Sequence, residues 1–271
     1  MNTKIMIKIA HEAPLSIMRK VQHMTDYDYA LVHLFEHPTV GPDYLKFFNE
    51  AMEKKREVIL DNSVFELGTA FDVNRFRSWV KALKPTYYII PDVLRNATET
   101  MNKIKDWSAI PGTKSIGVVQ GVTLDELIEC YKCIAKHCDM VAFPFNLPIY
   151  LSLSTQTRDP QAYCEGRKLF IDLLMERGVL DVNKPHHLLG TVLPQEVSQY
   201  RDEKYSFINS IDTSNPVIHG LHNIRYTDEG LEEKIPTMLH SMIETEVTSN
   251  QWSDIKFNIK KYRFFAGSVG E

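Results

Sequence analysis

The sequence is short of the features that mark secreted, membrane-spanning and disulfide-bonded proteins. Four cysteines in 271 residues are too few for a disulfide framework, and no apolar run approaches the roughly 18 residues that span a bilayer. The first eight residues contain no long apolar stretch and no small-residue cleavage site of a signal peptide. We therefore expect a cytoplasmic protein with reduced thiols and no membrane partner.

Other absences narrow the fold and the ligand. No G-x-G-x-x-G sequence follows the first apolar run, which argues against a dinucleotide-binding domain. The chain has no internal repeat, low-complexity segment or Pro/Gly-rich linker, so a single domain over residues 1–271 is predicted. The net charge of −4 disfavours a histone-like nucleic-acid binder but leaves room for a local basic groove.

What the sequence does contain is a series of short apolar runs separated by segments with helical periodicity. Continuously apolar runs are typical of parallel strands that are covered on both faces. The alternation predicts the α/β class, either a (β/α)8 TIM barrel or a large doubly wound sheet, and about 250 residues suit one barrel. The predicted strands are Lys4–Ala10, Tyr29–Phe35, Glu57–Asn62, Tyr87–Pro91, Ser115–Gln120, Met140–Phe145, His186–Gly190 and Phe207–Ile211.

The segments between the strands predict helices with recognisable ends. Asp72 is a suitable N-cap for one of them, and Gly178 suits the stop of another. The polar stretch Ile149–Asp159 is predicted to be a long loop. The predicted helices are Tyr44–Arg56, Val73–Leu83, Ala97–Trp107, Leu124–His137, Pro160–Arg177, a short one at Pro194–Tyr200, and two extra C-terminal helices at Glu232–Glu246 and Ser253–Tyr262.

Four of the predicted strands run into a carboxylate or a carboxamide. These residues are Asp61, Asp92, Gln120 and Asp212. In a parallel α/β barrel the carboxyl ends of the strands form the active-site rim, so the sequence predicts that these side chains share one site. A helix cap or a solvated turn is the alternative for each Asp taken alone, above all for Asp92, because a helix is predicted soon after it.

Carboxylates at a barrel rim suit two kinds of chemistry. They could hold a metal ion, or they could perform covalent and acid–base chemistry at an anomeric carbon. Gln120 favours the second, because a carboxamide carries both donors and an acceptor and suits the edge of a planar base.

The order of these segments resembles that of the tRNA-guanine transglycosylases and their DNA-acting phage and bacterial relatives, which are (β/α)8 barrels. Leu60-Asp61-Asn62-Ser63-Val64-Phe65 resembles the family's Asp-Ser-Gly-Gly-Phe segment, and Gly117-Val118-Val119-Gln120-Gly121 resembles Gly-Ile-Ile-Gln-Gly. Pro91-Asp92, His187-Leu188-Leu189-Gly190-Thr191 and Ile211-Asp212-Thr213-Ser214-Asn215-Pro216 follow in the family's order. The resemblance covers roughly residues 57–216.

The resemblance implies a role for each of these positions and requires no cofactor. Asp212 would be the nucleophile and Asp61 the general acid/base, while Asp92 and Gln120 would hydrogen-bond the guanine edge. The further predicted substrate-binding residues are Gly121, Asn62, Phe65, Phe143 and Asn146, of which the two phenylalanines could stack on a flipped base or simply pack in the core.

The sequence also departs from the family's tRNA-acting members. No cysteine follows Asp212, so their zinc site is absent and we expect no metal. Their Gly-Gly-Leu-Ala-Val-Gly-Glu segment is replaced by Val141–Asn146, and the chain has no room for a separate RNA-binding domain. These differences favour a small DNA-acting relative whose partners are DNA and a 7-deazaguanine base, either preQ0-like or preQ1-like.

Several alternatives stay open. Cys130, Cys133 and Cys138 have spacings that resemble metal ligands, but they lie in a predicted helix and buried thiols are the simpler interpretation. Among histidines, His11, His33 and His37 could touch phosphate or base, or be structural. A hydrolytic DNA glycosylase, a tRNA-guanine transglycosylase, an inactive barrel that binds a partner, and a metal-dependent hydrolase are the alternative functions. The oligomeric state is left open.

Overall fold

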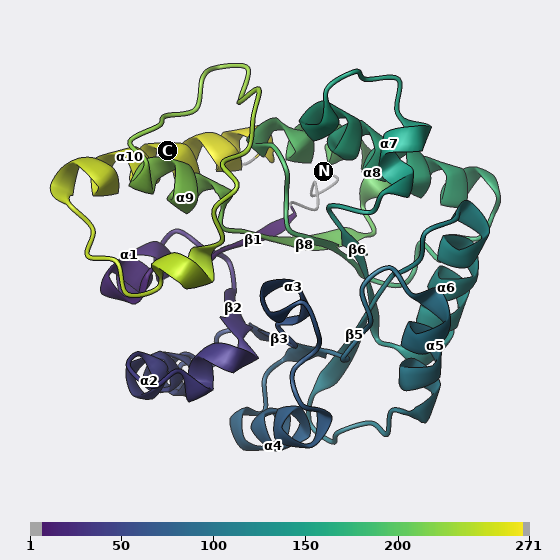
Figure 1. Ribbon diagram of the computed structural model, residues 1–271, viewed down its shortest axis with the longest axis horizontal. Coiled ribbons are helices and arrows are strands. Elements are labelled where there is room, and N and C mark those ends of the chain that lie inside the picture. The colour runs from purple at the N-terminus through teal and green to yellow at the C-terminus, as the bar shows by residue number, and fades with distance from the viewer. Residues whose placement is uncertain (1–6, 268–271) are drawn as a thin grey trace, which may run out of the picture. The chain divides into compact units, whose positions relative to one another are not determined.

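The structure, a computed structural model, describes residues 7–267. Within this range eight strands form one sheet in the order β1-β8-β7-β6-β5-β4-β3-β2, and every pairing with a determined register is parallel. Helices separate successive strands, so the chain has the (β/α)8 barrel fold predicted from the sequence (Figure 1). The strands are β1 (Lys8–His11), β2 (Asp28–Leu31), β3 (Val58–Asp61), β4 (Tyr87–Ile89), β5 (Lys114–Val118), β6 (Met140–Pro144), β7 (His186–Leu189) and β8 (Ile208–Thr213).

All eight strands occur where the apolar runs predict them, with different ends. Residues 4–6 of the first predicted strand lie outside the described range. The second prediction was too long, because β2 ends at Leu31 and the chain continues as the 3-10 helix η2 (Val32–Glu36). Leu31 is the last residue of β2 that is paired with β3, and its N–H donates to the hydroxyl of Tyr44. Asp212 lies inside β8 rather than after it.

Local sequence accounts for the helix starts. The Asp72 side chain accepts from Arg75 N–H and caps α4, as predicted, and Thr123 with Glu126 forms a capping box at α6. The helices that match predictions are α2 (Gly41–Glu53), α4 (Val73–Leu83), α5 (Ala97–Asp106), α6 (Leu124–His137), α8 (Asp159–Glu176), α10 (Ser249–Phe265) and the 3-10 helix η3 (Pro194–Tyr200).

Two predictions about the C-terminal half were wrong. Glu232–Glu246 is not an α-helix, because Pro236 lacks an N–H and disfavours helical backbone at the residue before it; only the 3-10 helix η5 (Leu239–Met242) forms there. The predicted loop Ile149–Asp159 begins with a helix, α7 (Ile149–Leu153). Short helices that were not predicted are η1 (Leu15–Ile17), α1 (Met18–Gln22), α3 (Val64–Leu67), η4 (Glu203–Tyr205) and α9 (Asn215–Leu221).

The chain divides into two compact units. Unit 1 comprises residues 1–25 and 144–271, and unit 2 comprises residues 26–143. In unit 1, α9 and α10 lie side by side, and α7 lies against α8 (Figure 1). A core forms between α1, α9, η5 and α10 from Ala13, Ile17, Val21, Val217, Ile218, Leu221, Leu239, Ile255 and Ile259. The single domain expected from the sequence stays a prediction.

Unit 2 has a core rich in aromatic rings. Phe35 packs against Tyr44, Phe48 and Trp79 with ring centroids 5.1–5.9 Å apart. The helices α5 and α6 lie side by side on the outside of this unit (Figure 1). These helices and rings bury the strands from which the polar residues of unit 2 emerge.

Candidate functional site

In unit 2, hydrogen bonds join three predicted site residues just past β3, β4 and β5. Asp92 accepts from Asn62 Nδ2 at 2.8 Å and from Gln120 Nε2 at 2.7 Å. Gln120 Oε1 accepts from the N–H of Arg95 at 2.9 Å. The N-cap of α5 is Asn96, so a helix cap is not the role of Asp92. The structure therefore fixes the orientation of the Gln120 carboxamide at both of its ends.

Asp92 is almost completely buried. Burial raises the pKa of its carboxyl group, and the hydrogen bonds from Asn62 and Gln120 oppose that shift. Gln120 Nε2 has a second N–H beyond the one that Asp92 uses. The buried pair is therefore held in a fixed orientation and retains one N–H of Gln120 that Asp92 does not use.

Asp61 is the last residue of β3 and is 7% exposed. The Tyr29 hydroxyl donates to Oδ2 at 2.5 Å, and the N–H of Ser63 donates to Oδ1. Ser63 has a φ of 59°, a left-handed conformation, at the position where the transglycosylase segment carries its first glycine. The chain after β3 thus turns through a left-handed Ser63, and the N–H of Ser63 together with the Tyr29 hydroxyl engages both oxygens of Asp61.

The remaining predicted residues of unit 2 have different surroundings. Phe143 is fully buried and stacks on Tyr131 with ring centroids 6.0 Å apart, so packing is the role that the structure shows for it. Phe65 lies on α3 and is 37% exposed. A Cβ on Gly121 would lie 3.0 Å from Glu126 Cβ, which indicates that this glycine lets the chain pass close to the start of α6.

In unit 1, Asp212 has one anchored oxygen and one that is unpaired. Oδ1 accepts from His187 Nε2 at 2.9 Å and from the N–H of Gly190 at 3.1 Å. His187 Nδ1 lies 2.9 Å from Ser210 Oγ, so with Nε2 protonated the ring accepts from Ser210 and donates to Asp212. Between residues 7 and 267 no hydrogen bond reaches Oδ2.

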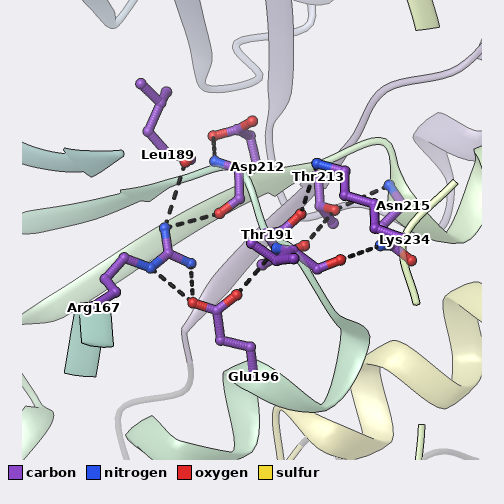
Figure 2. Close-up of polar contacts among 10 residues, drawn as sticks. Arg167, Leu189, Thr191, Glu196, Asp212, Thr213, Asn215 and Lys234 are labelled. Atoms are coloured by element: carbon purple, nitrogen blue, oxygen red, sulfur yellow. Dashed lines mark hydrogen bonds and ion pairs between the residues drawn. The ribbon is translucent and has the colours of Figure 1, made fainter. Parts of the chain in front are cut away.

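Gly190 is needed at the turn that holds Asp212. Its φ is 69°, and a Cβ there would lie 2.7 Å from a ring carbon of Phe145. Arg167 Nη1 donates to Gly190 O at 3.0 Å and more weakly to Leu189 O at 3.5 Å (Figure 2). Because Leu189 O and Gly190 N belong to one peptide group, the guanidinium polarises the N–H that binds Asp212.

Beneath this turn lies a fully buried ion pair. Arg167 Nε donates to Glu196 Oε1 at 2.8 Å, Nη2 lies 2.6 Å from the same oxygen as an ion-pair contact, and the two side chains are 0% and 1% exposed (Figure 2). Burial lowers the pKa of Arg167, but the charge of Glu196, the nearby Tyr200 and Tyr150, and the hydrogen bond to Glu196 together outweigh it, so the pKa is raised above its ordinary value. Glu196 Oε2 also accepts from the N–H of Val192. The pair therefore joins α8 and η3 to the chain that follows β7.

A second set of hydrogen bonds ties β7 to β8. The hydroxyls of Thr191 and Thr213 are 2.8 Å apart, and Thr213 Oγ1 also accepts from the N–H of Asn215. Asn215 Nδ2 donates to Val192 O at 3.0 Å, and its Oδ1 accepts from the Tyr226 hydroxyl. The backbone on both sides of Asp212 is thereby held in place.

Lys234 extends toward this network from the segment that follows α9. Its Nζ donates to Thr191 O at 3.3 Å (Figure 2). The same Nζ lies 4.0 Å from the centroid of the Phe145 ring. Burial lowers the pKa of Lys234 to about 8, while the charges of Glu196 and Asp212 act in the opposite direction. Lys234 therefore places a poorly solvated amine beside the Asp212 network.

The other predicted residues lie in separate surroundings. Asn146 is partly buried and makes no hydrogen bond through its side chain with the described part of the chain. His37 Nδ1 accepts from the N–H groups of Thr39 and Val40, a local structural role. His11 packs edge-on against Tyr262. The buried-thiol interpretation is confirmed, since Cys130, Cys133, Cys138 and Cys164 are all buried and none of them forms a disulfide.

Sequence reasoning missed His187, Arg167, Glu196 and Lys234. Only Arg167 stands at a position where the sequence pattern could have indicated a buried partner. Arg167 falls on the apolar stripe of α8 with Phe170, Ile171 and Leu174, where a charged residue must have a buried partner. The others carry no local pattern that sets them apart.

The described residues contain neither a cluster of metal-ligating side chains nor a membrane-spanning helix. In the range 7–267 no group of three or more His, Cys, Asp or Glu side chains could hold a metal ion. None of the helices in that range has the length and apolar character needed to cross a membrane.

Comparisons with known proteins add little to the site. Neither protein-family models nor curated proteins match the chain. Among solved structures, protein CitE from Mycobacterium tuberculosis with magnesium and acetoacetate matches at 10% identity and a TM-score of 0.45, over 79% of this chain and 87% of that one. The same protein with magnesium and acetate matches at 10% and 0.46, over 95% and 98%. Its complex with magnesium and pyruvate matches at 10% and 0.45, over 95% and 100%. Similarity at this level carries no inference about function.

Proposed function

We propose that the chain is an enzyme that exchanges guanine in DNA for a 7-deazaguanine base through a covalent bond between Asp212 and deoxyribose. The observation that carries the proposal is the asymmetry of the Asp212 carboxylate. Two donors orient Oδ1, while Oδ2 keeps its lone pairs for an electrophile. Asp61 and Asp92, which are not the nucleophile in this proposal, each have both oxygens engaged by hydrogen bonds.

The reaction divides into two displacements at C1′ of a nucleotide that is flipped out of the stack. Asp212 Oδ2 attacks C1′, the C1′–N9 bond breaks, and its electron pair leaves with guanine, which takes a proton from the Asp61 carboxyl group. The incoming 7-deazaguanine then gives its N9 proton to Asp61 and attacks C1′. The Asp212 carboxylate departs and the glycosidic bond is restored, as in retaining glycosidases.

In this proposal unit 2 supplies base recognition. Gln120 and Asp92 would read the purine edge with the hydrogen-bonding capacity that their mutual contact leaves free. Asn62 would hold Asp92 in place from behind, since its Nδ2 donates to both Asp92 and Ile90 O. The exposed ring of Phe65 would be available for stacking on a base.

Incorporation of labelled base tests the proposal. Purified protein is incubated with guanine-containing DNA, or with tRNA, and radiolabelled guanine, and label in the polymer is counted. We expect label in DNA, and an adduct between protein and DNA on a denaturing gel that Asp212→Asn abolishes. Abasic sites without incorporation would instead indicate hydrolysis, and label only in tRNA would overturn the DNA assignment.

A matched control separates chemistry from folding. Asp28 is another buried carboxylate of a strand, but it pairs with Arg56 at the start of β2. We expect Asp28→Asn to lose stability and still form the adduct. Loss of the adduct in both variants would show that the gel reports unfolding and would remove the support for Asp212.

A further inference from the structure

Lys234 has a rigid setting although it lies outside any helix or strand. The Gln195 side chain holds the backbone of Leu231 by two hydrogen bonds, donating to its carbonyl at 2.7 Å and accepting from its N–H at 3.1 Å. Arg158 and Gln161 bind Glu232, one through its carboxylate and one through its carbonyl. The residues just before Lys234 are therefore fixed to η3 and to the start of α8.

The ammonium group of Lys234 has few partners for a group so poorly hydrated. A lysine ammonium has three N–H donors, and Thr191 O accepts from one of them. No carboxylate forms an ion pair with Lys234 within residues 7–267. The carbonyl and the face of the Phe145 ring both favour the positively charged form of the amine. Among residues 7–267 the ammonium group of Lys234 is thus stabilised as a cation without a carboxylate in ion-pair contact.

Thr191 connects this cation to the proposed nucleophile. It follows Gly190, whose N–H binds Asp212, and its hydroxyl contacts Thr213, the next residue after Asp212. An anion bound at Lys234 would therefore lie close to the group that Asp212 attacks. In a nucleic acid, the group adjacent to the sugar is a phosphodiester.

We propose that Lys234 binds a backbone phosphate of the nucleotide whose C1′ is presented to Asp212. This inference rests on the proposed function, because it takes its ligand from that reaction. The phosphate contact would position the sugar and carries no base information. DNA and RNA share this phosphodiester chemistry, and the two polymers are separate arms of the test.

Binding of a phosphate at Lys234 should be coupled to uptake of a proton by its amine. The charged or titratable groups that interact with Lys234 include Glu196 on η3, Arg167 and Cys164 on α8, Asp212 on β8 and His219 on α9. Because burial lowers the pKa of Lys234 to about 8, part of the free protein is deprotonated at mildly alkaline pH. A bound phosphate favours the ammonium form, so affinity should fall by about tenfold between pH 7 and pH 9.

The test is fluorescence anisotropy with a guanine-containing DNA oligonucleotide and its RNA equivalent, at several salt concentrations. The variants are Lys234→Met, Lys234→Arg and, as a control that removes one charge, Lys256→Met at an exposed position of α10. Loss of one phosphate contact should reduce the slope of log Kd against log salt by about 0.7–0.9. We expect this for Lys234→Met alone, with Lys234→Arg restoring the slope and removing the pH dependence.

The outcomes separate this inference from the proposed function. Base exchange with an unchanged slope and KM in Lys234→Met would overturn the phosphate site and leave the exchange reaction standing. A reduced slope without exchange would overturn the reaction and leave the site. An equal reduction in Lys256→Met would show a general charge effect and overturn the site, and thermal unfolding of each variant checks that it is folded.

Discussion

Asp212 in unit 1 and Asp92 in unit 2 are both buried carboxylates near the carboxyl ends of strands, yet their hydrogen bonds differ. Asp92 accepts one carboxamide on each oxygen, whereas both donors to Asp212 meet at Oδ1. A carboxylate whose oxygens are both engaged can hold a neighbour in position. One with an open oxygen can react.

The groups behind the two carboxylates differ as well. Neutral side chains support Asp92, while a fully buried ion pair, Arg167 with Glu196, supports the turn that holds Asp212. Buried charges are costly to separate, so this pair fixes the turn firmly. The two units therefore hold a carboxylate by different means, neutral hydrogen-bond donors in unit 2 and a buried ion pair in unit 1. Removing one partner in each unit tests this difference.

The largest expected effect is a difference in activity between variants of the two carboxylates, Asp212 and Asp92. Asp212→Asn should lower kcat/KM for base incorporation by at least about 10³-fold, because the nucleophile is lost. Asp92→Asn should lower it by about 10- to 100-fold, because only a binding contact is weakened. Incorporation kinetics with labelled base measure both, and equal losses would break the distinction between reacting and holding.

The buried ion pair should dominate the stability of unit 1. Arg167→Met leaves Glu196 without its counter-charge and should lower the free energy of unfolding by about 3–5 kcal/mol. The double variant Arg167→Met/Glu196→Met should recover most of this loss. Urea denaturation measures each. In unit 2, Gln120→Met should lose only about 1–3 kcal/mol, since only neutral-donor hydrogen bonds, to Asp92 and from the N–H of Arg95, are removed.

The turn at Gly190 offers a sharper comparison within unit 1. Gly190→Ala forces a side chain into a φ of 69° and against Phe145, and should lower the free energy of unfolding by about 2–3 kcal/mol. Gly178 has a similar φ of 63° with nothing within 4 Å of a Cβ, so Gly178→Ala should lose about 1–2 kcal/mol. Equal losses in the two variants would contradict a steric role for Phe145.

The smallest effect concerns the pH dependence of unit 2. The folded-state pKa of Asp92 is raised by burial above its ordinary value of 3.8, so its protonated form stabilises the fold. That contribution is complete below 3.8 and is lost as the pH rises through the raised value. The free energy of unfolding of Asp92→Asn, relative to the native chain, should therefore increase across this interval. A relative decrease in urea titrations would show that the hydrogen bonds outweigh burial.

Much of the fold could be predicted because its determinants are local. Continuous apolar runs located all eight strands, and the caps at Asp72 and Thr123 lie at the starts of α4 and α6. Predictions failed where one residue overrode the periodicity, as Pro236 did, or where pairing decided the end of an element, as at Leu31. The positions of the candidate site residues followed from the strand ends.

The sequence by itself determined which residues end the strands and in what order. Only the tertiary structure decided what each of them contacts. His187 and Asp212 are 25 residues apart in the chain, Arg167 and Glu196 are 29 apart, and Thr191 and Lys234 are 43 apart. Local propensity carries no information about contacts between residues this far apart in the chain. A buried charge is costly without a partner, and which side chain becomes that partner is decided only when the strands have assembled. That selection engaged both oxygens of Asp92 and, among residues 7–267, left one oxygen of Asp212 without a hydrogen bond.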